Sequence, residues 1–175
     1  MRHSLSGAVL VGVLVAGPAR AADLRADMRE ATSSGPGASL GSVTVSETEA
    51  GVVFRTDLHG LPPGQRGFHV HENGSCAPGM VNGQQVAAGG AGGHLDPGHT
   101  GRHAGPTGHG HLGDLPVLTV APDGTAKESL TAPNIKDLAV IRGKALVIHG
   151  GGDNYSDMPE PLGGGGARIA CGIVQ

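Results

Sequence analysis

Residues 38–59 read ASLGSVTVSETEAGVVFRTDLH, two short runs rich in Val, Thr, Leu and Phe with acidic residues and a glycine between them. Apolar and polar residues alternate along both runs, which is the pattern of β-strands with one buried face. Clusters of Pro and Gly at 35–37 and 62–64 flank the pair as turn signals. The stretch therefore predicts two consecutive strands.

Similar runs recur along the rest of the chain, and none shows a helical period longer than a turn. Short strands at this spacing favour an all-β fold, an eight-stranded antiparallel Greek-key sandwich or barrel. A tight turn, PDG at 122–124, separates two of the runs. The expected strands cover 24–31, 38–48, 51–59, 67–72, 117–120, 125–131, 140–149 and 167–174.

Glycine and proline are frequent, at 33 and 12 of 175 residues, and aromatic residues make up only 2%. Such a composition borders on low complexity. The glycines, however, crowd into 60–113 and 150–166, between the expected strands. We therefore expect one folded domain with two long functional loops, at 73–115 and 150–166, because loops of that length are usually functional or disordered.

The first 21 residues have the pattern of a secretory signal peptide. Arg2 precedes an apolar stretch at 8–16, and Ala19, Arg20 and Ala21 form an Ala-x-Ala cleavage pattern. The apolar run is shorter than the roughly 20 residues needed to cross a bilayer. We expect cleavage to leave an exported domain, 22–175, with no membrane insertion; a retained anchor is the alternative.

The charge of the chain bears on its binding partners, and its two cysteines bear on a disulfide bond. Without the leader, ten basic residues face 15 acidic ones, a formal charge of −5, which argues against a nucleic-acid partner. Export would place Cys76 and Cys171 where disulfides persist, and two cysteines allow one pairing. That bridge would close a loop of about 95 residues, worth about 4 to 5 kcal/mol in the chain-entropy model. Two separate buried thiols are the alternative.

Histidines give the main functional signal. In GFHVHENGSC, 67–76, His69 and His71 lie one residue apart, so both project from one face of a strand while Phe68 and Val70 project into the core. Alone, such a pair is more often ordinary surface. Nine histidines in the mature chain, most beside glycines that allow close folding, favour a metal site instead.

The ligand types indicate which metals would bind. Imidazole suits copper, zinc, iron and nickel, and a disulfide would remove the soft thiol ligands. Asp114 follows His111 by three positions, so one tight turn can bring both to the same ion, and a His-rich set with one Asp is good zinc chemistry. Histidine tracts also form loose metal-binding loops without catalysis, and that alternative stays open here.

Six segments form a specific pattern along the chain: GFHVHENGSCAP at 67–78, AGGHLDPG at 91–98, HAGP at 103–106, GHLGDLP at 110–116, IHGGGDNYSD at 148–157 and PLGGGGARIACGIV at 161–174. In these motifs and their order the sequence resembles the exported bacterial copper/zinc superoxide dismutases. The resemblance covers nearly the whole mature chain.

The resemblance implies one copper and one zinc ion per subunit. His94 would belong to both ligand sets, as an imidazolate bridge between the two ions. Asp153 would hydrogen-bond histidines on both sides and fix their orientation; a turn-forming aspartate is the alternative. The implied copper ligands are His69, His71, His94 and His149, and the implied zinc ligands are His94, His103, His111 and Asp114.

The resemblance also implies that Arg168 attracts and docks the superoxide anion, held near copper by Cys171 three residues further on. An incidental surface ion pair is the alternative. Neither 80–93 nor 156–160 contains a lysine, so electrostatic steering would depend more heavily on Arg168. His59, His99 and His109 have no implied role, and we expect them in loops or at the surface.

The implied activity is antioxidant defence in the periplasm. Two superoxide anions and two protons would yield O2 and H2O2 in a Cu(II)/Cu(I) ping-pong cycle that also uses His94. Rival interpretations are a non-catalytic copper or zinc binder on the same fold and an adhesion-type sandwich with incidental histidines. Family members occur as monomers and dimers, so a homodimer is possible.

Overall fold

The computed structural model describes residues 22–175, and within them the chain is almost entirely β-structure and loop. Its strands and 3-10 helices are β1 Leu24–Thr32, β2 Gly35–Thr48, β3 Gly51–Leu58, β4 Gly64–Arg66, β5 Phe68–Val70, β6 Gly79–Val81, β7 Gln84–Val86, η1 Gly89–Ala91, β8 Leu118–Val120, β9 Ser129–Ala132, η2 Leu138–Val140, β10 Ala145–His149, η3 Pro161–Gly164 and β11 Arg168–Ile173. No helix in this range is long and apolar enough to cross a membrane.

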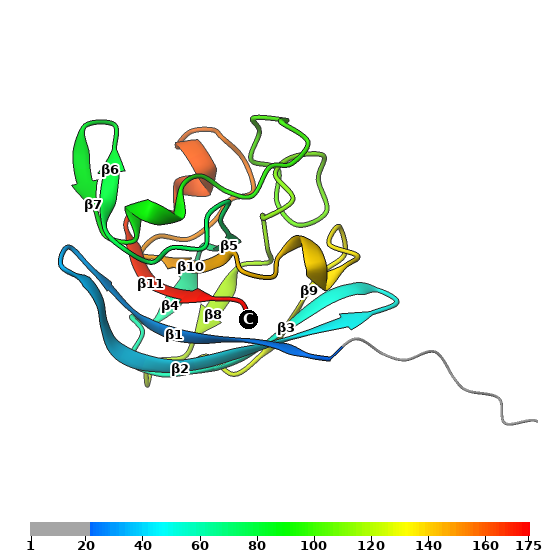
Figure 1. Ribbon diagram of the computed structural model, residues 1–175, viewed down its shortest axis with the longest axis horizontal. Helices are drawn as coiled ribbons and strands as arrows, with labels where there is room; N and C mark the ends of the chain where they lie inside the picture. The colour runs from blue at the N-terminus through cyan, green and yellow to red at the C-terminus, as the bar shows by residue number, and fades with distance from the viewer. Residues whose placement is uncertain (1–21) are drawn as a thin grey trace, which may run out of the picture.

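Seven strands form one curled sheet in the order β5-β10-β11-β1-β2-β3-β9 (Figure 1). All its neighbouring pairs are antiparallel. The order β11-β1-β2-β3 places a late strand beside the first of three consecutive ones, which is the Greek-key arrangement. The predicted all-β antiparallel fold is therefore confirmed.

The structure has more strands than predicted, and some boundaries differ. The additional strands β4, β6 and β7 have three residues each, too few for an alternating pattern to be visible. The predicted turn at 35–37 is wrong, because the chain reverses at Ser33–Ser34 and Gly35 already begins β2. The expected strand 140–149 begins only at Ala145, after η2.

The core is built by the alternation that the sequence shows. In β1, Leu24, Ala26 and Met28 are buried while the residues between them are exposed. Phe54 of β3 meets Phe68 of β5 edge to face, with ring centroids 5.9 Å apart. Aliphatic side chains make up most of the remaining apolar cluster, so this core carries little aromatic surface.

Three adjacent strands position the functional region. In β10, Val147 pairs with His69 of β5, and His149 pairs with Arg168 of β11. The two long loops, 73–115 and 150–166, lie on the same side of the barrel, above these strands (Figure 1). Residues far apart in the sequence are thereby brought to one end of β10.

The predicted disulfide between Cys76 and Cys171 is present, with the two Cα atoms 5.7 Å apart. It joins the first long loop to β11, three residues beyond Arg168. The loop between Cys76 and His94 contains the β6–β7 hairpin and η1. The predicted leader, 1–21, lies outside the described residues.

Candidate metal centre

Four buried histidines from two strands and a loop form the first histidine group, defined as His69, His71, His94 and His149. His69 lies in β5 and His149 ends β10. A β-bridge joins His71, directly after β5, to His94 in the first long loop. One ring nitrogen of each lies within 4.8 Å of the others, a separation at which four ligands can share one ion.

A second group adjoins the first and contains a carboxylate. It consists of His69, His94, His103 and Asp114, whose ligand atoms again lie within 4.8 Å of one another. Nδ1 of His94 donates to Oδ1 of Asp114 at 2.9 Å. Nδ1 of His103 lies 3.0 Å from Oδ2 of Asp114. His94 and His69 are therefore common to both groups.

His111, the remaining residue of the implied zinc set, lies at the edge of the second group. Its Nδ1 is 3.4 Å from Oδ1 of Asp114, and its ring centroid is 5.4 Å from that of His94. The compact group thus contains His69 where the sequence led us to expect His111.

The ring nitrogens that point into the centre are not hydrogen-bonded. Buried polar atoms normally have a partner, and leaving one without costs about 1–3 kcal/mol. A metal ion would bind these nitrogens, displacing the proton that His103 shares with Asp114, so the donor set fits copper and zinc. Among residues 22–175, the buried side-chain atoms without a hydrogen bond are Nδ1 of His69, His103 and His111 and Nε2 of His71, His94 and His149.

His94 belongs to both groups of ligands. Its Nδ1 contacts Asp114 of the second group, and its Nε2 is buried without a hydrogen bond. Its second nitrogen is thus free to serve the first group. One imidazole can therefore connect two ion positions.

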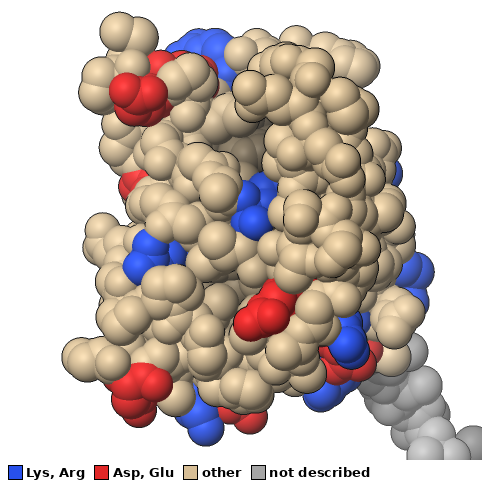
Figure 2. All heavy atoms as spheres, turned by 90° about the vertical axis from the view of Figure 1, so that its left-hand side faces the viewer, with Lys and Arg blue, Asp and Glu red and all other residues tan. Residues whose placement is uncertain are grey.

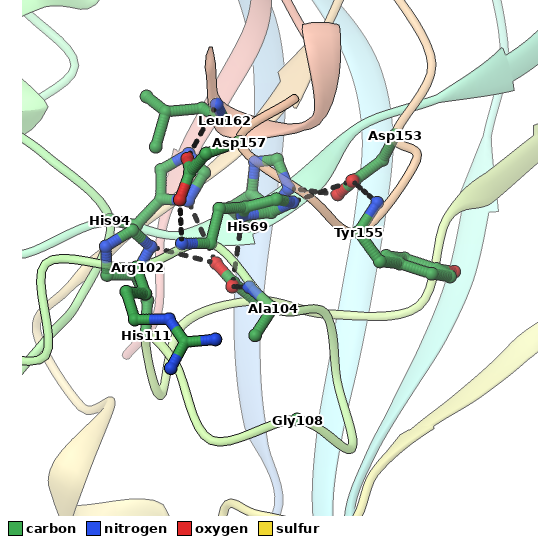
Figure 3. A network of polar contacts seen from close by, with 12 residues as sticks. His69, His94, Arg102, Ala104, Gly108, His111, Asp153, Tyr155, Asp157 and Leu162 are labelled. Atoms are coloured by element: carbon green, nitrogen blue, oxygen red, sulfur yellow. Dashed lines mark hydrogen bonds and ion pairs between the residues drawn. The ribbon is translucent and has the colours of Figure 1, made fainter. Parts of the chain in front are cut away.

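Outer hydrogen bonds fix the orientations of the other rings. Asp153 accepts from Nε2 of His69 and from Nε2 of His103, both at 2.7 Å (Figure 3). Nδ1 of His71 donates to the Gly92 carbonyl at 3.0 Å. Such partners determine which ring nitrogen keeps the lone pair.

Burial keeps the first group neutral. Burial lowers the pKa of His69, and burial together with neighbouring histidines lowers the pKa of His71 and His149 well below the ordinary value. Burial and His69 lower the pKa of His94 to about 4, although Asp114 opposes the shift. Neutral imidazoles are the form that binds metals.

The second group behaves differently because carboxylates surround it. Burial alone would lower the pKa of His103, but Asp114 and Asp153 outweigh it and raise the pKa to about 9. Burial would raise the pKa of Asp114 and Asp153, yet contacts with His103 and its neighbours hold both below the ordinary range. In the metal-free protein a positive His103 therefore sits between two carboxylates.

Arg168 lies beside the first group and is held by two main-chain carbonyls. Nη1 donates to Ala88 O at 2.7 Å, and Nη2 donates to Gly92 O at 2.6 Å. Because Gly92 O also accepts from His71, one carbonyl links the guanidinium to the histidine group. Ala88 and Gly92 belong to the loop that the disulfide joins to β11.

A cavity of about 510 Å³ opens onto the first group. We call it the central cavity; its walls include His71, His94, His149, Arg168, Val86 and Leu162. Arg168 is the one Lys or Arg among its lining residues. Figure 2 shows the side of the molecule that carries the β6–β7 hairpin, with few charged groups and a basic patch set in a hollow. A small anion could approach the histidines here.

Comparison with known proteins shows to which family this chain belongs. The sequence profile described as "Copper/zinc superoxide dismutase (SODC)" matches residues 39–174. The chain belongs to the copper/zinc superoxide dismutase family. Like that family, it is an oxidoreductase that acts on superoxide, with copper and zinc as cofactors.

Similar dismutases align over nearly the whole chain. "Superoxide dismutase [Cu-Zn] 2" of Salmonella typhimurium is 54% identical over 166 residues, 95% of this chain and 96% of that protein. The structure of the Brucella abortus enzyme matches with a TM-score of 0.86 and 52% identity, covering 88% of this chain and all of that one. The monomeric Salmonella enterica enzyme matches at 0.78 and 56%, with coverage of 88% and 100%.

Some functional contacts gave no signal in the sequence. The carbonyls of Ala88 and Gly92 hold Arg168, but any residue type offers a carbonyl. Leu162 lines the central cavity in a left-handed backbone conformation that its residue type does not predict. His59, His99 and His109 are exposed and belong to neither group, in line with the surface positions expected of them.

Proposed function

We propose that this chain dismutates superoxide in the periplasm, with copper in the first histidine group and zinc in the second. The copper ligands would be Nδ1 of His69 and Nε2 of His71, His94 and His149. The zinc ligands would be Nδ1 of His94, His103 and His111 and a carboxylate oxygen of Asp114. The observation that carries the proposal is the set of six buried ring nitrogens without a hydrogen bond, two of which, Nδ1 of His103 and Nδ1 of His111, lie 3.0 and 3.4 Å from Asp114 oxygens.

The metals and the protein have separate tasks. When bound, copper supplies a reversible one-electron couple that side chains lack, and zinc supplies a fixed charge without redox change. Arg168 attracts the anion into the central cavity and orients it beside the histidines. Asp153 keeps the rings of His69 and His103 in their binding orientations.

His94 also handles a proton in the proposed cycle. Two superoxide anions and two protons give O2 and H2O2, so one proton must be available at the anion in the second half-reaction. His94 lines the central cavity. Its Nε2, proposed above as a copper ligand, would take up a proton only in the half-reaction in which it is not bound to copper, and would donate that proton in the other. The shared ring therefore contributes to chemistry as well as to metal binding.

We further propose export, with removal of residues 1–21 leaving 22–175 as the mature enzyme. The Ala-x-Ala pattern, the disulfide and the bacterial relatives support this location. Residues 22–175 of one chain contain every group named above, so a homodimer is not needed to complete the site. A relative solved as a monomer supports a single chain as the active unit.

Metal analysis combined with a superoxide-decay assay tests the proposal. We expect about one copper and one zinc per chain, loss of activity on copper removal and recovery on re-addition. His94→Ala should lose activity, whereas the exposed His109→Ala should match the wild type. Stoichiometric metal binding without faster superoxide decay would instead support the non-catalytic binder.

A further inference from the structure

Asp157, in the second long loop, bridges two parts of the centre and has no role in the proposed chemistry. Its Oδ2 accepts from the backbone N–H of His103 at 2.9 Å, and its Oδ1 accepts from the backbone N–H of Leu162 at 3.2 Å (Figure 3). One side chain thus contacts the loop that carries His103 and the segment that forms a wall of the central cavity.

Leu162 adopts a backbone conformation that leucine rarely uses. Its φ is 53° and its ψ is 44°, in the left-handed region that costs free energy for residues with a Cβ. The side chain remains 40% exposed, so burial does little to repay this cost. The bond from its N–H to Asp157 is the side-chain contact that holds the conformation.

The residue after Leu162 explains why this conformation matters. Gly163 is buried at φ 71°, and a Cβ there would lie 2.1 Å from Oδ1 of Asp153 and 2.9 Å from Nε2 of His103. The backbone therefore lies directly against the Asp153–His103 pair at the residue that follows Leu162. Asp157 contacts this segment through the N–H of Leu162 and the neighbouring loop through the N–H of His103.

The cavity that Leu162 lines has mainly apolar walls. Besides Leu162 these include Val81, Val86 and Ala167, and Arg168 is the basic group among them. An anion that enters this space loses part of its hydration shell and gains a contact with one cation, the Arg168 guanidinium. Small, weakly hydrated anions lose least in that exchange, and a leucine at the wall adds a steric limit.

We propose that Asp157 is a positioning residue that couples the His103 loop to the wall of the central cavity, and that Leu162, which it holds, restricts the cavity to small anions. The inference rests on the proposed function for its metal assignments. It requires no titration of Asp157, only that its two oxygens keep accepting from the two backbone N–H groups.

Hydrogen exchange of two backbone amides tests the coupling directly. In Asp157→Ala, the amides of His103 and Leu162 should exchange about tenfold faster than in the wild type, because each loses its acceptor. Asp157→Asn keeps part of the acceptor capacity and should lie between the two. Asp23→Ala removes an exposed aspartate elsewhere and serves as the control. Unchanged exchange at both amides in a folded Asp157→Ala protein would overturn the coupling.

Two further measurements separate the halves of the proposal. Asp157→Ala should release zinc to a chelator roughly fivefold faster, whereas Leu162→Ala should release it at the wild-type rate. For anions, the copper absorption band should be titrated with azide and the larger benzoate. Both variants should bind benzoate more tightly relative to azide; an unchanged ratio in Leu162→Ala would refute the steric limit.

A failure of the proposed metal-dependent function would give a different result from a failure of the Asp157 coupling. The exchange experiment runs equally well in metal-free protein, so fast exchange in Asp157→Ala can be observed whether or not zinc and copper bind. If the wild type took up no metal while the two amides still depended on Asp157, the metal assignment would fail and the coupling would stand.

Discussion

Arg168 shows how much of the site depends on a single side chain. It is the one Lys or Arg lining the central cavity, in a chain whose residues 22–175 carry a formal charge of −5. Two carbonyls hold its guanidinium, and one of them, Gly92 O, also holds His71. Local positive potential at the cavity therefore originates from a group fixed against the histidines.

Replacing Arg168 with alanine should lower the second-order rate with superoxide roughly tenfold or more at low ionic strength. The rate should also respond less to added salt, because the screened attraction is gone. Arg168→Lys, which keeps the charge but not the two-carbonyl fit, should fall between the two. Rates measured over a range of salt concentrations check this. An unchanged rate at low ionic strength would contradict it.

Gly163 gives a second test at the same scale. Gly163→Ala should destabilise the protein by roughly 3 kcal/mol, because the new Cβ would collide with Asp153 and His103. Gly83→Ala is the matched control: it also has a positive φ, 79°, but nothing lies within 4 Å of its Cβ position. The control should cost only about 1 kcal/mol from backbone strain. Denaturant titrations compare them, and equal losses would argue against the close packing.

The length of each strand decides whether it could be predicted from the sequence. Strands β1, β2 and β3 were predictable because each is long enough to show alternation. The hairpin β6–β7 was not, since three-residue strands in a loop show no period. The residues of the centre came from the resemblance, while the ring nitrogens, the Arg168 carbonyls and the Asp157 contacts depend on backbone geometry that sequence patterns do not encode.

The disulfide supports the loop that holds Arg168. Replacing Cys76 and Cys171 with serine should reduce the free energy of unfolding by about 4 to 5 kcal/mol in the chain-entropy model, because the closed loop spans 95 residues. Azide affinity at the copper site should also fall, since Ala88 and Gly92 are then less firmly placed. Unfolding titrations and azide titrations measure the two effects. Lost stability with unchanged azide affinity would limit the disulfide to a stabilising role.

At the scale of the whole molecule, the metals should contribute to folding. The core has few aromatic side chains, and within residues 22–175 four buried histidine nitrogens have neither a hydrogen bond nor an ion-pair contact. Binding to the folded state alone adds the binding free energy to stability.

We therefore expect the metal-free, reduced protein to melt more than about 10 °C below the metal-loaded, oxidised protein. The metal-free, oxidised form should melt between them and so separate the two contributions. Calorimetry on the three forms provides the measurement. Equal melting temperatures for the first two forms would contradict the expectation.

The bond between the first long loop and β11 also bears on the timing of maturation. While the thiols are reduced, no covalent bond would fix the loop whose carbonyls hold the Arg168 guanidinium. With export as proposed above, oxidation outside the cytoplasm would then strengthen capture of the anion. A newly made chain would gain full activity only after export.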